Sequence, residues 1–217
     1  MNQQNTPSDY FPDEIFKAYD VRGIVDSALT TTITRKIGQA FGSEARSRDV
    51  DSVIIARDGR LSGPALSSAL SEGLRASGCD VIDVGMVPTP TLYFATYELG
   101  TGTGIMITGS HNPPEYNGLK MVMAGETLAG ERIQELKQRI LTEQYSTGAG
   151  ALSEIDIKPA YVKRILSEGK LSRELHAVVD CGNGVASEIA PELLSELGCK
   201  ITPLYCNTDG NFPNHHP

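Results

Sequence analysis

Ser110 stands in the string Thr108-Gly-Ser-His-Asn-Pro113, which directly follows the apolar run Ile105–Ile107. Gly109 allows a sharp backbone turn, and the consecutive prolines at 113 and 114 stiffen the exit of the loop. A hydroxyl held there is a candidate acceptor for a transferred group, because ligands of α/β sheets gather beyond the carboxyl ends of the strands. Composition alone favours the alternative, an ordinary surface loop rich in glycine and proline.

Two common serine chemistries do not fit this string. A nucleophile elbow requires Gly-x-Ser-x-Gly, and Asn112 stands where the second glycine belongs. His111 is adjacent to Ser110 in the chain, and side chains of neighbouring residues usually diverge. We therefore expect His111 to be poorly placed as a general base for the serine.

The elements that must hold this loop alternate between strands and helices. Strands are predicted at the short apolar runs 53–56, 81–84, 105–107, 119–123 and 177–180. Helices are predicted between Pro64 and Gly78, from Thr89 as N-cap with Pro90 at the first helical position, and over 133–140 and 189–197. This alternation predicts an α/β fold with a mixed, mostly parallel sheet flanked by helices.

The second half of the chain repeats a pattern of the first. Asp58 precedes Gly78-Cys79 by 20 residues, and Asp180 precedes Gly198-Cys199 by 18 residues. Both stretches predict strand, glycine turn, helix, Gly-Cys and strand, which indicates a duplicated supersecondary unit.

A domain boundary is predicted between these two blocks. The segment 142–153 contains Ser-Thr-Gly-Ala-Gly and no apolar period, which is typical of a linker. We therefore predict a first domain over 1–152 and an incomplete second domain of the same α/β type over 153–217. Because the stretch 211–217 is turn-rich and closes no helix or strand, we expect the second domain to be cut short.

Composition excludes several classes of protein. The 217 residues carry 19 Lys and Arg against 27 Asp and Glu, a net charge of −8, which argues against nucleic acid as a partner. No stretch reaches the roughly 18 apolar residues of a membrane span, so no membrane partner is expected, and the first residues do not resemble a secretion signal. The four cysteines form no C-x-x-C pair; we expect reduced thiols, buried at Cys79 and Cys199, and a cytoplasmic protein.

Several strings together resemble one enzyme family. They are Tyr19-Asp-Val-Arg-Gly23, Ala56-Arg-Asp-Gly-Arg60, Pro88-Thr-Pro90, Thr108-Gly-Ser-His-Asn-Pro113, Asn117-Gly-Leu-Lys120, Val179-Asp-Cys-Gly-Asn-Gly184 and Asp209-Gly-Asn-Phe-Pro213. Their order and spacing are similar to those of the N-terminal portion of the α-D-phosphohexomutases, and within them of the bacterial phosphomannomutase/phosphoglucomutase group.

The resemblance implies an intramolecular phosphotransferase that interconverts hexose 1-phosphate and hexose 6-phosphate. Ser110 would carry the transferable phosphate, pass it to the sugar phosphate to form a bisphosphate, and take the other phosphate back. Arg22 and Lys120 match positions of the family's active site. Tyr19, His111 and Asn112 would be supporting residues that shape the loop or contact the substrate.

Physical chemistry agrees with these implied roles. Phosphoserine carries a charge of about −1.5 to −2 at pH 7, and phosphoryl transfer depends mainly on positioning and charge neutralisation. Arg22 offers a planar fork for phosphate oxygens. Lys120 alternates with Leu119 and Met121, so its side chain should point away from theirs, and a lysine near other cations is suited to proton transfer. The alternative for each cation is an ordinary solvated side chain.

Two patterns limit the assignment. Gly182-Asn-Gly184 lacks the third glycine of a dinucleotide fingerprint, since Ser187 replaces it, and is better explained as a strand-to-helix turn. The resemblance implies a Mg²⁺ ion bound to the phosphate of Ser110 and to three aspartates, but no Asp-x-Asp-x-Asp occurs; Asp49-Val-Asp51 is followed by Val53. We therefore expect the chain alone to be catalytically silent. The alternative is a non-catalytic remnant or interaction module with the same fold.

Overall fold

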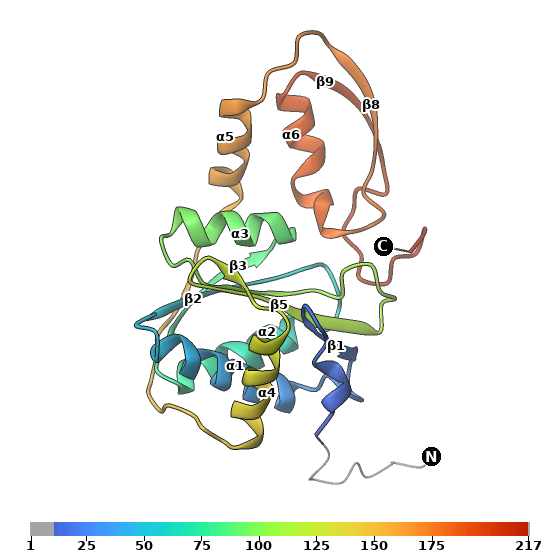
Figure 1. The fold of residues 1–217 in the computed structure, drawn as a ribbon. Helices are drawn as coiled ribbons and strands as arrows, with labels where there is room; N and C mark the ends of the chain where they lie inside the picture. The colour runs from blue at the N-terminus through green and yellow to red at the C-terminus, as the bar shows by residue number, and fades with distance from the viewer. Residues whose placement is uncertain (1–10, 217) are drawn as a thin grey trace, which may run out of the picture.

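The computed structural model describes residues 11–216 and contains two units, each built on its own sheet (Figure 1). The elements of the first unit are η1 (Asp13–Ile15), β1 (Val21–Ile24), α1 (Thr31–Arg46), β2 (Ser52–Arg57), α2 (Gly63–Ala76), β3 (Asp80–Met86), α3 (Thr89–Glu98), β4 (Gly104–Ile107), β5 (Tyr116–Met123), β6 (Glu126–Thr127), α4 (Glu131–Leu141) and β7 (Leu152–Glu154). The elements of the second unit are α5 (Lys158–Glu168), β8 (Leu175–Asp180), η2 (Val185–Glu188), α6 (Ala190–Glu196) and β9 (Cys199–Leu204).

The first sheet has the strand order β1-β5-β4-β2-β3-β7, with β6 paired to β5. The pairs β4–β2, β2–β3 and β3–β7 are parallel, whereas β5 runs antiparallel to both β1 and β4. The prediction of a mixed, mostly parallel sheet flanked by helices is therefore confirmed. The antiparallel strand β5 lies between β4 and β1 and pairs with both of them.

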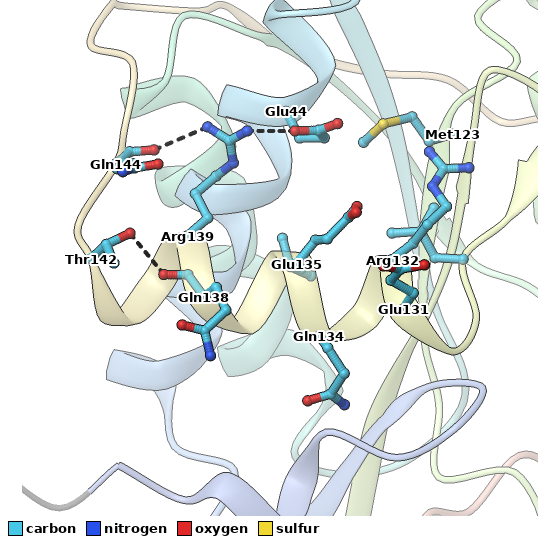
Figure 2. A pocket seen from close by; sticks show the side chains of 12 residues that line it. Glu44, Met123, Glu131, Arg132, Gln134, Glu135, Gln138, Arg139, Thr142 and Gln144 are labelled. Atoms are coloured by element: carbon cyan, nitrogen blue, oxygen red, sulfur yellow. Dashed lines mark hydrogen bonds and ion pairs between the residues drawn. The ribbon is translucent and has the colours of Figure 1, made fainter.

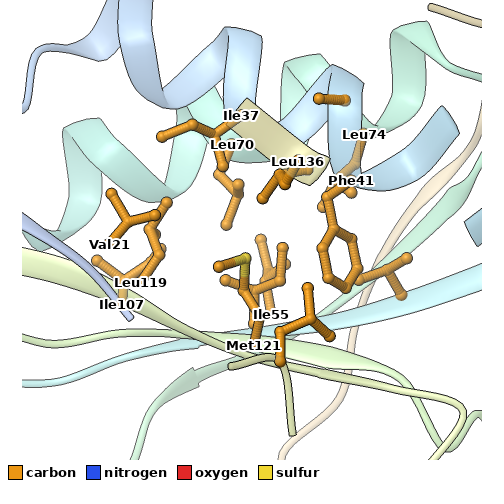
Figure 3. Close-up of a cluster of buried hydrophobic side chains, with 14 of the residues drawn as sticks. Val21, Ile37, Phe41, Ile55, Leu70, Leu74, Ile107, Leu119, Met121 and Leu136 are labelled. Atoms are coloured by element: carbon orange, nitrogen blue, oxygen red, sulfur yellow. The ribbon is translucent and has the colours of Figure 1, made fainter. Parts of the chain in front are cut away.

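Helices cover both faces of this sheet. α1, α2 and α4 lie on one face, and α3 lies on the other, between the sheet and the second unit (Figure 1). Figure 3 shows the larger core, in which Ile37, Phe41 and Leu70 of the helices meet Ile107 and Leu119 of the strands. Full burial of such side chains is worth about 1.5–3 kcal/mol each, which makes this layer a rigid platform for the sheet edge.

The predicted helix start at Thr89 needs one correction. The N-cap is Pro88, and Thr89 is already the first helical residue, with no side-chain capping hydrogen bond. Pro90 lies within the first two helical positions, where its missing N–H costs no hydrogen bond. Hence the start of α3 is set by Pro88 and Pro90 rather than by a threonine cap.

The segment predicted as a linker is attached to the first unit. The Ser146 N–H donates to Ser43 Oγ at 2.9 Å, the Gly150 N–H donates to the carbonyl oxygen of Arg75 at 2.9 Å, and β7 then pairs with β3 at Val81–Asp83. This segment has no apolar periodicity, but backbone hydrogen bonds attach it to the first unit. The hydropathy pattern of a sequence does not reveal such contacts. The boundary between 152 and 153 stays a prediction, although β7 extends over both sides of it.

The second unit repeats the supersecondary pattern of the first. β8 and β9 are parallel neighbours, as β2 and β3 are, and each pair is joined through a helix. Gly78 and Gly198 end the two corresponding helices with φ of 96° and 94°. A left-handed residue at this place stops a helix without a Cβ penalty, so the duplicated glycine has the same local function in both units.

Burial differs between the corresponding cysteines. Cys79 is fully buried, as predicted, but Cys199 is only partly buried, because β9 is covered on one face alone. All four thiols are free, and none of the helices that the structure describes is long and apolar enough to cross a membrane.

Candidate active site

Ser110 lies in a tight loop directly after β4, at the carboxyl end of that strand. Its backbone is left-handed, with φ of 54°, and its N–H donates to Thr108 Oγ1 at 2.9 Å. A non-glycine residue in this region costs about 1 kcal/mol or more and persists only where the surroundings impose it. Ser110 is partly exposed, so the loop presents it to solvent.

His111 lies closer to the serine than the sequence led us to expect. Ser110 Oγ and His111 Nδ1 are 3.3 Å apart, within hydrogen-bonding distance. The expectation that the two side chains diverge was wrong, because the left-handed backbone at Ser110 redirects its side chain toward the next residue. The imidazole is exposed and adjoins the hydroxyl on the solvent side.

Arg22 and Lys120 lie on the same face of the sheet. In the antiparallel pair β1–β5, Arg22 is opposite Gly118, and Lys120 is two residues further along β5. Residues two apart in a strand share a face, and diagonal partners are roughly 7–8 Å apart. The Thr108 N–H, near the base of the serine loop, donates to the Gly118 carbonyl at 3.0 Å. The register therefore brings both cations to the sheet edge from which the loop projects.

Arg22 has unused hydrogen-bonding capacity. Its Nη2 donates to the carboxylate of Asp20, and its Nε is buried and has no hydrogen-bond partner among the residues that the structure describes. An unpaired buried donor is costly, so it favours an acceptor such as a phosphate oxygen.

The remaining predicted residues divide into two kinds. The Asn112 side chain donates to the Gly109 carbonyl at 3.0 Å, which shapes the loop from within. Tyr19, in the bend before β1, is 77% exposed and does not pack in the core, so its side chain is free to contact a ligand.

Arg60 makes contacts with the serine loop that sequence reasoning did not foresee, since the sequence suggested only that Arg57 and Arg60 could add positive charge near a strand end. Arg60 occupies the turn after β2, where an arginine would ordinarily be solvated, yet its side chain is 0% exposed. Its Nη1 donates to the carbonyls of Pro113 at 2.6 Å and Tyr116 at 3.0 Å, and its Nη2 to those of Ser110 at 3.0 Å and Asn112 at 2.7 Å. The only sequence signal was its place in the Arg-Asp-Gly-Arg string, which gives a charge but no partner.

The described residues do not form a magnesium site by themselves. Within residues 11–216, no three His, Cys, Asp or Glu side chains lie together as metal ligands would. Mg²⁺ requires near-octahedral oxygen ligands, so the phosphate of Ser110 would need carboxylates that this part of the chain does not gather there.

A hollow of about 540 Å³ between α1 and α4 is not connected with this loop (Figure 2). Arg139 in its lining donates to Glu44 and to the Gln144 carbonyl, and Arg132 pairs with Glu126 at 3.0 Å. Burial raises the pKa of Glu44, but hydrogen bonds from Arg48 and Arg139 outweigh this and hold the pKa below its usual value. The contact between Arg139 and Glu44 joins α4 to α1, which is a structural role.

Both units of the chain match known protein families. The family model for phosphoglucomutase/phosphomannomutase α/β/α domain I matches residues 13–147, and that for domain II matches residues 159–217. A phosphomannomutase/phosphoglucomutase of Pseudomonas aeruginosa is 53% identical over 206 residues, which are 95% of this chain and 44% of that protein. One of Pseudomonas syringae is 48% identical over 217 residues, all of this chain and 47% of that protein.

A solved structure has the same fold. The crystal structure of a phosphoglucomutase/phosphomannomutase family protein from Burkholderia thailandensis superposes with a TM-score of 0.90 at 50% identity, over 93% of this chain and 46% of that one. The chain thus spans a little under half of the length of the curated relatives it matches. With family models matching both of its units, the chain belongs to the phosphoglucomutase/phosphomannomutase family.

Proposed function

We propose that this chain carries the phosphoserine of an enzyme that interconverts hexose 1-phosphate and hexose 6-phosphate. The observation that supports the proposal best is the loop of Ser110, a partly exposed residue at a strand end on the edge that also bears two cations. We further propose a cytoplasmic location, where the four free thiols stay reduced.

The proposed transfer exchanges one P–O bond for another. Ser110 Oγ attacks the phosphorus of a hexose bisphosphate, the bond between phosphorus and the sugar oxygen breaks, and the serine proton passes to that oxygen. In the reverse direction the sugar hydroxyl attacks the phosphoserine and loses its proton. His111 Nδ1, at 3.3 Å from Ser110 Oγ, is in place to accept the serine proton.

The two cations have separate proposed roles. Arg22, with an unpaired buried Nε, would bind phosphate oxygens and offset the negative charge that phosphoserine brings. Lys120, on the same face, would exchange a proton with the sugar hydroxyl. Tyr19 and Asn112 would support these groups, one at the ligand side and the other within the loop.

We propose that these residues accept phosphate without completing turnover on their own. The 217 residues contain no Asp-x-Asp-x-Asp string, and the described residues gather no carboxylate cage for Mg²⁺.

Intact-mass spectrometry tests the proposal. The purified chain is incubated with glucose 1,6-bisphosphate, and we expect it to gain the mass of one phosphate. Ser110→Ala should abolish this gain, whereas Ser68→Ala, an exposed serine on α2, should retain it. Incorporation that persists in Ser110→Ala contradicts the assignment, and no incorporation in the unaltered chain favours the alternative of a non-catalytic module.

A second assay addresses turnover. Mannose 1-phosphate is supplied with Mg²⁺ and the bisphosphate, and formation of the 6-phosphate is followed. We expect none from the purified 217-residue chain, so clear conversion would refute the silence of the chain alone.

A further inference from the structure

The guanidinium of Arg60 uses its entire hydrogen-bonding capacity. Besides the four carbonyls of the serine loop, its Nε donates to Asp58 Oδ2 at 3.2 Å, so that all five N–H groups have acceptors. A lysine has only three N–H donors on one nitrogen and cannot make these five hydrogen bonds. The contacts connect β2 with a loop that lies 50 to 56 residues later in the chain.

The serine loop leaves space for the guanidinium of Arg60. A Cβ on Gly109 would lie 2.3 Å from Arg60 Cζ and 2.5 Å from its Nε, a distance that no side chain tolerates. Glycine is therefore needed at position 109 so that the backbone next to Ser110 can rest directly on the guanidinium.

A turn of the second unit packs on the same arginine. The ring of Phe212 lies 5.3 Å from Arg60 Cζ in a cation–π contact. A Cβ on Gly210 would lie 2.7 Å from the Gly59 carbonyl oxygen, so the turn Asp209–Phe212 is pressed against the turn that carries Arg60. Arg60 thus lies between the serine loop of the first unit and a turn of the second.

The buried positive charge of Arg60 is stabilised by the groups in direct contact with it. Burial lowers the pKa of Arg60, the carboxylate of Asp58 raises it, and the nearby charge of Arg22 lowers it again. An uncompensated buried charge is strongly unfavourable, so the four carbonyls and the carboxylate are what keep the cation in place.

We propose that Arg60 is the positioning residue of the serine loop, and that the turn Asp209–Phe212 couples the second unit to that loop through it. The effect of Arg60 on phosphate transfer rests on the function proposed for Ser110, whereas its effect on the loop conformation does not. Arg60 reaches only carbonyl oxygens of the loop and Asp58, so it acts through the backbone and not on the transferred group. Arg60 holds Ser110 in its left-handed backbone conformation. Without Arg60, or without the turn Asp209–Phe212 that packs on it, nothing would impose that strained conformation.

Hydrogen exchange of the full 217-residue chain, read on peptides covering 108–117, tests this. The reporters are the amides of Ser110, Asn112 and Tyr116, which donate within the loop. In Arg60→Ala they should exchange about ten-fold faster or more, while α1 and α2 keep their protection. Added guanidinium chloride at tens of millimolar should restore protection by refilling the site, and equal sodium chloride should not.

Two further variants separate positioning from general stability. Phe212→Ala removes the cation–π contact at a partly exposed position and should raise exchange of the same three amides by a smaller factor. Arg57→Ala, at the last residue of β2 and paired with Asp83 at 3.5 Å, should leave them unchanged. If Arg60→Ala does not fold, Phe212→Ala decides. Unchanged loop exchange in a folded Arg60→Ala, or in Phe212→Ala when only that variant folds, overturns the inference.

The two proposals fail in different ways. The rate of phosphate transfer from glucose 1,6-bisphosphate to Ser110 should fall about ten-fold in Arg60→Ala and recover with guanidinium. If the unaltered chain takes up no phosphate, the function proposed for Ser110 fails, yet the exchange experiment still measures whether Arg60 holds the loop. If phosphate transfer is normal in Arg60→Ala, the positioning role is refuted while the phosphoserine stands.

Discussion

At the scale of single residues, the thiols of Cys181 and Cys206 show how neighbours set reactivity. Their Sγ atoms are 3.3 Å apart at the ends of β8 and β9. Burial raises the pKa of Cys181, and the hydrogen bond and charge of Cys206 raise it further, to about 11. Because the thiolate is the nucleophile, Cys181 should be almost unreactive at neutral pH.

Alkylation with iodoacetamide, followed by peptide mass spectrometry, measures this. The rate at Cys181 should still be rising at about pH 11, where the thiol is half ionised and the rate is half of its limiting value. In Cys206→Ala the neighbouring contribution is lost, so Cys181 should react faster at every lower pH. Equal rates in the two proteins would contradict the coupling between the thiols.

The candidate site could be predicted from the sequence only in part, for reasons visible at single residues. Ser110, Arg22 and Lys120 were singled out because short strings of fixed order carry them. Arg60 and the contact between Ser110 and His111 could not be predicted. The contacts of Arg60 depend on carbonyls 50 to 56 positions away, and the contact of Ser110 with His111 depends on a backbone angle that serine disfavours.

At the scale of elements, the packing of α1 on α2 depends on backbone contact at Gly73. A Cβ at this position would lie 2.0 Å from the Arg35 carbonyl oxygen and 2.8 Å from the Gln39 nitrogen. Gly73→Ala should therefore destabilise the first unit by about 2 kcal/mol, although alanine is the better helix former. Chemical denaturation followed by circular dichroism measures the change.

The control for this variant lies on the same helix. Ser68 is exposed on α2, so Ser68→Ala should change the free energy of unfolding by no more than about 0.5 kcal/mol. A Gly73→Ala protein as stable as this control would mean that the two helices separate without cost.

Elements were predictable where local periodicity agreed with tertiary burial. The strands 53–56, 81–84, 105–107 and 119–123 lie inside β2, β3, β4 and β5, since a buried strand reads as an apolar run. β1, α1 and α5 were missed. For α1 the signal existed, because Ile33, Ile37 and Phe41 recur at helical spacing after the capping Thr30. The four residues of β1 are too few for any period.

At the scale of the whole molecule, burial is unequally shared between the two units. Beyond residue 155, only Ile157 and Ile189 are buried apolar side chains among the residues that the structure describes, whereas the first unit contains two extensive cores. We therefore expect amides after 155 to exchange faster than those of 50–140, since local opening there exposes little apolar surface.

Hydrogen exchange of the unaltered chain checks this expectation. β8 and β9 are the most informative peptides, because they correspond in the repeat to β2 and β3, which should be among the last to exchange. Uniform protection across both units would contradict the expectation and would mean that the contact of Asp209–Phe212 with Arg60 stabilises them as one cooperative body.

The two-stranded sheet has a consequence for handling the protein. Among the described strands, β8 and β9 pair only with each other, so each presents one row of backbone N–H and C=O groups without a ladder partner. Such a row is a template on which an extended segment of another molecule can add. Val178 on β8 is 69% exposed and offers an apolar contact to a segment that binds there. Concentrated solutions will therefore favour association through this sheet, and dilute solutions will keep the molecules apart.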